Sequence, residues 1–334
     1  MPRSTLYLRT GQVSCGVVDT DSKNWPPLDI INPSACGWLR APIGFLAGAL
    51  MEWHVQSQQV RESHMLTDST QASANMLARI MVDTRQAVEQ RKLEVPLAGV
   101  HALASIQGRT QDLSSWIRSE EKVSLIAQVK RTSPDMEMPI ENYDPVMLAY
   151  RFAASGARAL TVATNEKYYH GGIADLTLVS QEVDIPVIRQ DFVYDEYQII
   201  EARAAGADGV LLISSLLEAE HLRTLISIAQ RNRMTAVVQV QSREEVLEAI
   251  AFEPRVIAIS NRDMGDFKVD LDTTLRLREL IPPHMTVISM GGLRTAEDVA
   301  YVRQANIDAI VVGQALLTAP DTAEAISELF KQTA

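Results

Sequence analysis

The sequence predicts a (βα)8 TIM barrel with an N-terminal helical extension. Short apolar segments rich in β-branched residues recur eight times between residues 124 and 313, as expected of parallel strands buried on both faces. Helical patterns separate most of these segments, which favours a closed barrel over a doubly wound sheet of eight strands. The dinucleotide fingerprint Gly-x-Gly-x-x-Gly does not follow the first segment, so the usual nucleotide-binding sheet is disfavoured.

Each expected strand stops at a polar residue or a turn. The strands are expected at 124–129, 159–164, 186–192, 209–214, 235–240, 256–261, 286–291 and 309–313. Helices are expected at 145–154, 196–205, 218–231, 243–251 and 296–304. Because the loops after the strands form the catalytic face of a barrel, polar residues at the strand ends are the candidates for a site.

The chain before the first strand divides into two parts, an extension at 1–65 and helices at 66–120 that pack on a barrel at 121–334. Apolar residues recur at spacings of three and four over 70–100, which predicts a helix that ends near Pro96. A second helix is expected at 113–120.

The extension contains an apolar segment at 37–55. Packing on the barrel's own flank is favoured for it, and docking of a protein partner or a membrane surface is the alternative. The longest apolar stretch, 41–51, has eleven residues, short of the roughly 20 that cross a bilayer, so no transmembrane span is expected. Residues 1–18 carry arginines and no acid, a faint transit-peptide pattern, so organelle import is the lesser alternative to a cytoplasmic location.

Composition excludes several classes of function. The formal charge of −11 and a pI near 5.1 argue against nucleic-acid binding, because such surfaces are basic. The only cysteines, Cys15 and Cys36, lie in the extension, so no disulfide framework holds the barrel and a reducing compartment is expected. No Cys or His cluster has metal-ligand spacing, so we expect neither a metal site nor a cofactor.

Two glycine turns close the series of strands. Gly291 and Gly292 follow the seventh strand, and Gly313 and Gln314 follow the eighth. Many barrels hold a phosphate in these two loops, where glycine permits close approach of backbone N–H groups. We therefore expect a phosphate site here, and tight turns without a ligand are the alternative.

From about residue 75 to 329 the chain resembles the indole-3-glycerol phosphate synthase family, barrel lyases of tryptophan biosynthesis that decarboxylate and cyclise an anilino-deoxyribulose phosphate. The resemblance implies a phosphorylated small-molecule ligand. The matching pieces, besides the two glycine turns, are Arg91-Lys92, Val95-Pro96-Leu97, I-A-Q-V-K-R-T-S-P from 126, E-K-Y-Y-H-G-G from 166, P-V-I-R-Q-D-F from 186, Tyr197-Gln198, G-A-D-G-V-L-L-I from 206 and S-N-R-D from 260.

The resemblance also implies a catalytic set that this chain replaces. The family has a glutamate at the position of Gln128, the lysine regarded as the general acid of ring closure at Gln190, and a proton-shuttling glutamate at Gln239. It has an asparagine at Ser260 and a glutamate at Met290.

Other family positions are kept. Lys130 and Ser133 follow the first strand, Phe192 follows the third, and Arg262, which holds the substrate carboxylate in the family, follows the sixth. The resemblance implies that Ser133, Phe192 and Arg262 bind the substrate or its phosphate.

These replacements predict lost chemistry, because a glutamine amide neither gains nor loses a proton near pH 7. We expect a catalytically impaired or repurposed homologue, a pseudoenzyme that binds a phosphorylated ligand or serves as a structural subunit. The alternative is an active lyase that uses Lys130 as acid, with Asp191 or a water as base.

Four residues near the strand ends have more than one interpretation. His170 is either a base or, preferably, a solvated loop residue. Tyr168 and Tyr169 either line the pocket or pack on the barrel rim. Asp191 is expected to cap the helix that follows it.

Overall fold

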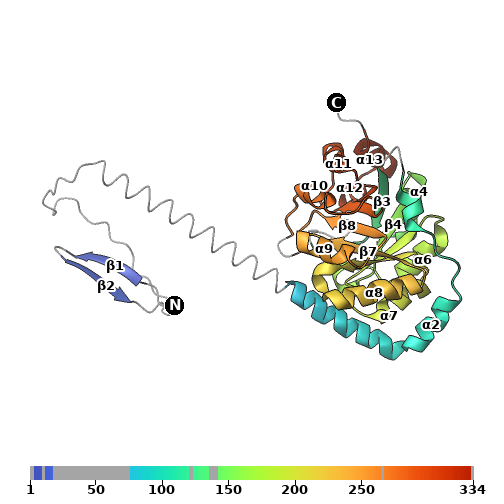
Figure 1. Ribbon diagram of the computed structural model, residues 1–334, viewed down its shortest axis with the longest axis horizontal. Coiled ribbons are helices and arrows are strands. Elements are labelled where there is room, and N and C mark those ends of the chain that lie inside the picture. Colours follow the sequence, from blue (N-terminus) through green and yellow to red (C-terminus); the bar gives the residue numbers. More distant parts are fainter. Residues whose placement is uncertain are drawn as a thin grey trace. The chain divides into compact units, whose positions relative to one another are not determined.

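The computed structural model describes residues 76–119, 123–134, 142–264 and 267–331, and the backbone of two strands near the N terminus (Figure 1). These two strands, β1 (Ser4–Arg9) and β2 (Gln12–Val17), pair antiparallel and belong to a unit, Met1–Arg61, distinct from the unit Glu62–Ala334 that holds the barrel. The sequence reading did not predict this strand pair. The apolar segment 37–55 lies outside the described residues, and the domain boundaries at 65 and 120 stay predictions.

Eight parallel strands form a closed barrel in the order β10-β3-β4-β5-β6-β7-β8-β9, which confirms the predicted fold. The chain order runs around the barrel, and β10 closes it by pairing with β3, Ala309 opposite Ser124. The strands are β3 (Ser124–Val129), β4 (Ala159–Ala163), β5 (Val187–Gln190), β6 (Gly209–Ile213), β7 (Thr235–Val240), β8 (Val256–Ser260), β9 (Thr286–Met290) and β10 (Ala309–Val312).

Two strands have the predicted bounds, and the others end one or two residues earlier than predicted. At two of these strand ends, the side chain of the first residue beyond the strand makes a hydrogen bond with a neighbouring strand. Thr164 accepts a hydrogen bond from Arg189, and Asn261 donates to the hydroxyl of Ser289. Gly291 ends β9 because its φ of +85° leaves the extended region.

The helices surround the barrel (Figure 1). Asp144 caps α4 by accepting from two backbone N–H groups, and Ser242 and Thr295 cap α9 and α11 through their hydroxyl groups. The named helices are α2 (Leu97–Ser105), α3 (Leu113–Ile117), α4 (Pro145–Ala154), α5 (Glu166–Tyr169), α6 (Ile173–Glu182), α7 (Glu196–Ala204), α8 (Ala219–Arg231), α9 (Arg243–Ile250), α10 (Asp272–Arg278), α11 (Ala296–Arg303), α12 (Gln314–Leu317) and α13 (Thr322–Leu329).

Residues 76–94 are helical, as predicted. Pro96 ends this helix but also precedes the first turn of α2, so a new helix begins at Leu97. This 76–94 helix is attached to the barrel by polar contacts. The Tyr197 hydroxyl donates to the carbonyls of Arg91 and Val95, and the ammonium of Lys92 pairs with Asp195 at 2.8 Å.

Two apolar cores support the strand ends. One lies between the strands and the helices, and the other fills the barrel with Ile126, Ile188, Leu211, Val237 and Ile288. Both cores are buried, so the side chains at the C-terminal ends of the strands stand on a packed base.

Candidate active site

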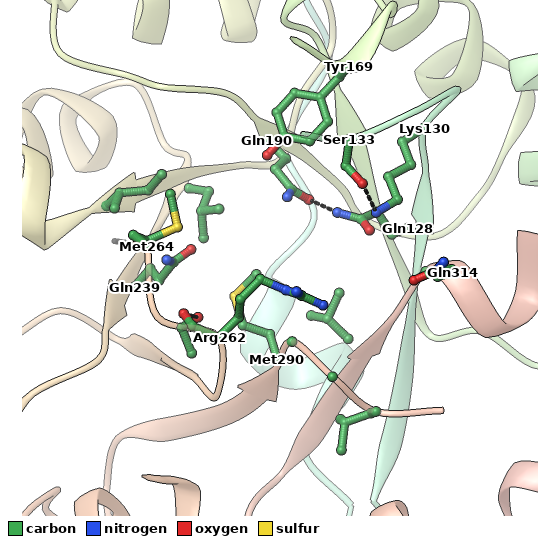
Figure 2. Close-up of a pocket in the computed structure, with 18 of the residues that line it drawn as sticks. Gln128, Lys130, Ser133, Tyr169, Gln190, Gln239, Arg262, Met264, Met290 and Gln314 are labelled. Carbon is green, nitrogen blue, oxygen red and sulfur yellow. Dashed lines mark hydrogen bonds between the residues drawn. The ribbon is translucent and has the colours of Figure 1, made fainter. Parts of the chain in front are cut away.

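A cavity of about 120 Å³ opens at the C-terminal ends of the strands, the face where barrel enzymes carry their sites. Gln128 from β3, Gln190 from β5 and Gln239 from β7 all line it (Figure 2). The three positions that the family resemblance assigns to acid and base chemistry therefore share one cavity.

The side chains of Gln128 and Gln190 bind each other. The Gln128 Nε2 donates to the Gln190 Oε1 at 2.6 Å, and both side chains are buried (Figure 2). The Gln128 Oε1 lies against Gly313, where a Cβ atom would come within 2.3 Å of it. Gly313 thus makes room for the Gln128 amide, and a side chain at this turn would force that amide to move.

Gln239 lies across the barrel from Gln128, because β7 is four strands away from β3 in a ring of eight, and it is two strands away from Gln190 on β5. Its neighbours at the same level of the sheet are Ile213 on β6 and Ala258 on β8. The side chain is 5 % exposed, and no hydrogen bond joins its amide to another residue of the described ranges.

Three cationic side chains of the described residues line the cavity, those of Lys130, Arg262 and Arg294. The Lys130 Nζ donates to the Ser133 hydroxyl at 3.0 Å (Figure 2). The Arg262 Nη1 donates to the carbonyl of Phe267 at 3.0 Å, within the loop that follows β8. The Ser260 hydroxyl donates to the Arg262 carbonyl at 2.8 Å, so it steadies the start of the same loop.

Among the described residues that line the cavity, the one carboxylate is Asp191. Its two oxygens accept from Thr164, Asn165, the guanidinium of Arg189 and the Phe192 backbone N–H, at 2.8–3.2 Å. The prediction that Asp191 caps the next helix is wrong, because α7 begins one turn later and Asp195 caps it. Both oxygens of Asp191 are therefore occupied by donors from the protein.

The guanidinium of Arg189 holds the Asp191 carboxylate in this position. It is 1 % exposed and binds Asp191 and Glu201 at 3.0 and 2.8 Å. Burial disfavours the charged form of Arg189, but the two carboxylates outweigh that cost and raise its pKa.

The glycine turns line the cavity as predicted, and protein side chains approach both of them. Gly292 has a φ of +82°, and a Cβ there would meet Val269 at 2.1 Å, so the loop after β8 covers this turn. Arg294 donates to the Gln314 Oε1 at 3.2 Å, which joins the loops after β9 and β10. Met290 is buried at the end of β9 and lines the cavity beside them.

Phe192 does not line the cavity, and its contact with substrate stays a prediction. Its ring is 1 % exposed, and Tyr169 stacks on it at 5.9 Å between ring centroids while Tyr168 meets it edge-on at 6.2 Å. Tyr169 lines the cavity and also packs on Phe192 at the barrel rim, which are the two interpretations given to it above. His170 is exposed at the end of α5 and outside the cavity.

Glu245 is a residue that the sequence reading missed. Its carboxylate accepts from the Ser214 hydroxyl after β6 at 3.1 Å and from the Gln241 N–H after β7 at 2.9 Å. Burial raises the pKa of Glu245. The two partners lie at the ends of neighbouring strands, so Glu245 fixes the loops that flank Gln239.

No group of three or more His, Cys, Asp or Glu side chains in the described ranges could hold a metal ion. Over the same part of the chain, none of the helices is both long and apolar enough to span a bilayer.

The comparisons with known proteins agree on one family. A family profile described as indole-3-glycerol phosphate synthase matches residues 77–329. Proteins of that name from Roseiflexus sp. (strain RS-1) and Dehalococcoides mccartyi (strain CBDB1) are 37% and 36% identical to the chain, each over 76% of it, and the matches cover 97% and 99% of the two relatives.

A solved structure of 3-hexulose-6-phosphate synthase superposes with a TM-score of 0.50 at 20% identity, over 62% of this chain and 98% of that one. This likeness concerns the fold alone. With the profile and the relatives together, the chain belongs to the indole-3-glycerol phosphate synthase family.

Proposed function

We propose that the barrel mouth binds a phosphorylated small anion and that it does not perform the proton transfers of decarboxylative ring closure. The observation that carries this proposal is the composition of the cavity wall. Gln128, Gln190 and Gln239, at the positions to which the family resemblance assigns acid and base chemistry, are neutral amides, and the cations Lys130 and Arg262 line the same wall.

The charges of the wall favour an anion. Among the described residues, the wall carries the cations Lys130, Arg262 and Arg294 and one carboxylate, Asp191, which is paired with Arg189. A wall of this composition favours a ligand that brings negative charge. A phosphate ester supplies that charge, and Gly292 and Gly313 stand at the two loops where barrels often hold phosphate.

The proton-transfer groups argue against catalysis. Ring closure with loss of water needs an acid for the carbonyl oxygen and a base for the departing proton, and each positioned group contributes about 10²–10⁴-fold. The Gln128 and Gln190 amides are tied to each other and Gln239 is equally neutral, so none of the three supplies or removes a proton.

Binding tests the first half of the proposal. Calorimetric titration with a pentose phosphate should give a measurable Kd, and Lys130→Met should weaken it at least tenfold because the variant keeps the length of the side chain and removes its charge. Lys331→Met, at an exposed lysine outside the cavity, is the matched control and should leave the Kd unchanged. Equal affinities of wild type and Lys130→Met contradict an anion site at the mouth.

Restoring the family residues tests the second half. The triple variant Gln128→Glu, Gln190→Lys, Gln239→Glu should produce more indole product from the anilino-deoxyribulose phosphate than wild type, by about a hundredfold or more. Equal rates mean that the glutamines are not what limits turnover.

The second candidate is an active indole-3-glycerol phosphate synthase. The names and the 36–37% identity of the relatives favour it, since they cover nearly the whole length of those proteins. In that case Lys130 is the acid, and a water in the cavity is the base because Asp191 is occupied by its donors. Lys130→Met then abolishes turnover, whereas under the first candidate there is little turnover to lose.

The apolar segment 37–55 as a docking surface for a protein partner, and a cytoplasmic location, stay predictions of the sequence.

A further inference from the structure

The three glutamines of the mouth are not equivalent. Gln128 and Gln190 satisfy part of each other's hydrogen-bonding capacity across the 2.6 Å contact. Gln239 has the same chemical groups and similar burial, 5 % exposed against 8 % and 7 %, but no partner in the described part of the chain for either its oxygen or its nitrogen.

An unpartnered amide in this position needs an explanation. Native proteins rarely leave the polar atoms of so enclosed a side chain without a protein, water or ligand partner. The Gln239 amide faces the cavity (Figure 2), so a group inside the cavity can satisfy it.

The surroundings limit what that group can be. Ile213 and Ala258 flank Gln239 at its own level of the sheet, and Leu211 and Met264 also line the cavity. These side chains offer no hydrogen bonds, and Ser260 and Arg262 on the neighbouring side already donate to backbone carbonyls. The Gln239 amide can supply both a donor and an acceptor to a ligand.

We infer that Gln239 recognises an uncharged group that both donates and accepts a hydrogen bond, a hydroxyl pair or a carboxamide, on the phosphorylated ligand. This inference rests on the proposed function. A carboxylate fits poorly because it only accepts, which leaves the Gln239 oxygen facing a negative charge. An alkyl group leaves both amide atoms unpaired. Gln239 thus determines which neutral group the ligand carries beyond its phosphate, and the cations Lys130 and Arg262 attract the phosphate.

Four phosphate esters with five-carbon chains test the inference by calorimetric titration. They are pentyl phosphate, ribitol 5-phosphate, the phosphate ester of 5-hydroxypentanamide and the phosphate ester of 5-hydroxypentanoate. Gln239→Met keeps the length of the side chain and removes its polar atoms. Gln304→Met, at an exposed position after α11, is the control.

Wild type should bind the polyol or the amide ester more tightly than pentyl phosphate. Gln239→Met should weaken that binding about tenfold and change pentyl phosphate less than twofold, and Gln304→Met should change neither. Comparison of the polyol with the amide then identifies the neutral group.

The outcomes separate this inference from the proposed function. Equal effects of Gln239→Met on all four esters, or a carboxylate ester that depends most on Gln239, overturn the inference while the anion site stands. Failure of every ester to bind wild type overturns both.

Discussion

Strand β5 places two opposite kinds of chemistry on its two faces. Arg189 points toward α7, where it is buried between Asp191 and Glu201 and also donates to the carbonyl of Gln198. The next residue, Gln190, points into the mouth and binds the neutral amide of Gln128. Adjacent residues of one strand therefore lie in a fully paired ionic network and in an uncharged amide pair.

The difference between the two faces of β5 shows which charged residues stabilise the fold. The ionic network joins β5, α7 and the 76–94 helix, since Glu201 also binds Arg91 at 2.8 Å, so losing one member leaves buried charges unpaired. The mouth opens to solvent, and an amide of similar size can replace a charged side chain there without harm to the fold. Charge in the mouth serves a ligand or a reaction, and its loss concerns function.

The largest expected effect is on the ionic side of β5. Arg189→Met should lower the free energy of unfolding by about 3–5 kcal/mol, because it leaves Asp191 and Glu201 buried without their common cation. Urea denaturation measures it. Gln190→Met is the matched control one residue away and should cost about 1 kcal/mol, the value of one hydrogen bond between neutral groups. Equal costs for the two variants break the comparison.

The buried carboxylate of Asp208 allows the same comparison to be tested through the dependence of stability on pH. Asp208 accepts from the N–H groups of Gln111 and Val187 at 2.7 and 2.9 Å, and burial raises its pKa above the ordinary value of 3.8. The folded protein therefore binds this proton more readily than the unfolded chain does. The contribution of Asp208 to stability is full below the ordinary pKa and is lost as the pH rises through the raised one.

Asp208→Asn should remove the loss of stability that accompanies ionisation of Asp208 as the pH rises. Urea midpoints between pH 4 and 7 should fall less steeply with rising pH in the variant than in wild type, whatever the variant's absolute stability. Parallel profiles mean that Asp208 does not titrate in that range.

The smallest expected effect lies at the rim, where a charged contact meets the mouth. The Tyr168 hydroxyl donates to Asp83 at 2.5 Å, and Lys167 pairs with the same carboxylate at 2.6 Å. Burial, together with the Asp83 hydrogen bond, raises the pKa of Tyr168 to about 12.

Ultraviolet titration of wild type against Tyr168→Phe should isolate a tyrosine that ionises near pH 12. Asp83→Asn should lower that pKa only in part, because the burial of the ring is unchanged. A full return to the ordinary value of 10.0 means that the carboxylate alone sets the pKa.

The strands were predictable because their apolar, β-branched runs are buried on both faces, and β3 and β7 have the predicted bounds. The helices α6, α10 and α13 were missed by the periodicity reading, although α13 begins with a regular Asp321 cap. The family pattern located the glutamines at strand ends, and the barrel then brought them to one cavity.

Side-chain partners were beyond the sequence. Phe192 was expected in the pocket, but Tyr169 from the neighbouring strand's loop covers it. Asp191 was expected to cap a helix, but the buried Arg189 holds it. Both outcomes depend on contacts between segments far apart in the chain and on rotamers, which local patterns do not specify.

The most direct test of the account is the rate of indole product formation from the anilino-deoxyribulose phosphate, followed by fluorescence. Wild type is measured beside the 37%-identical relative from Roseiflexus. If Gln128, Gln190 and Gln239 stand at the acid and base positions, as the proposed function holds, the expected rate is at least about 10⁴-fold lower than that of the relative. A rate within tenfold of the relative contradicts it.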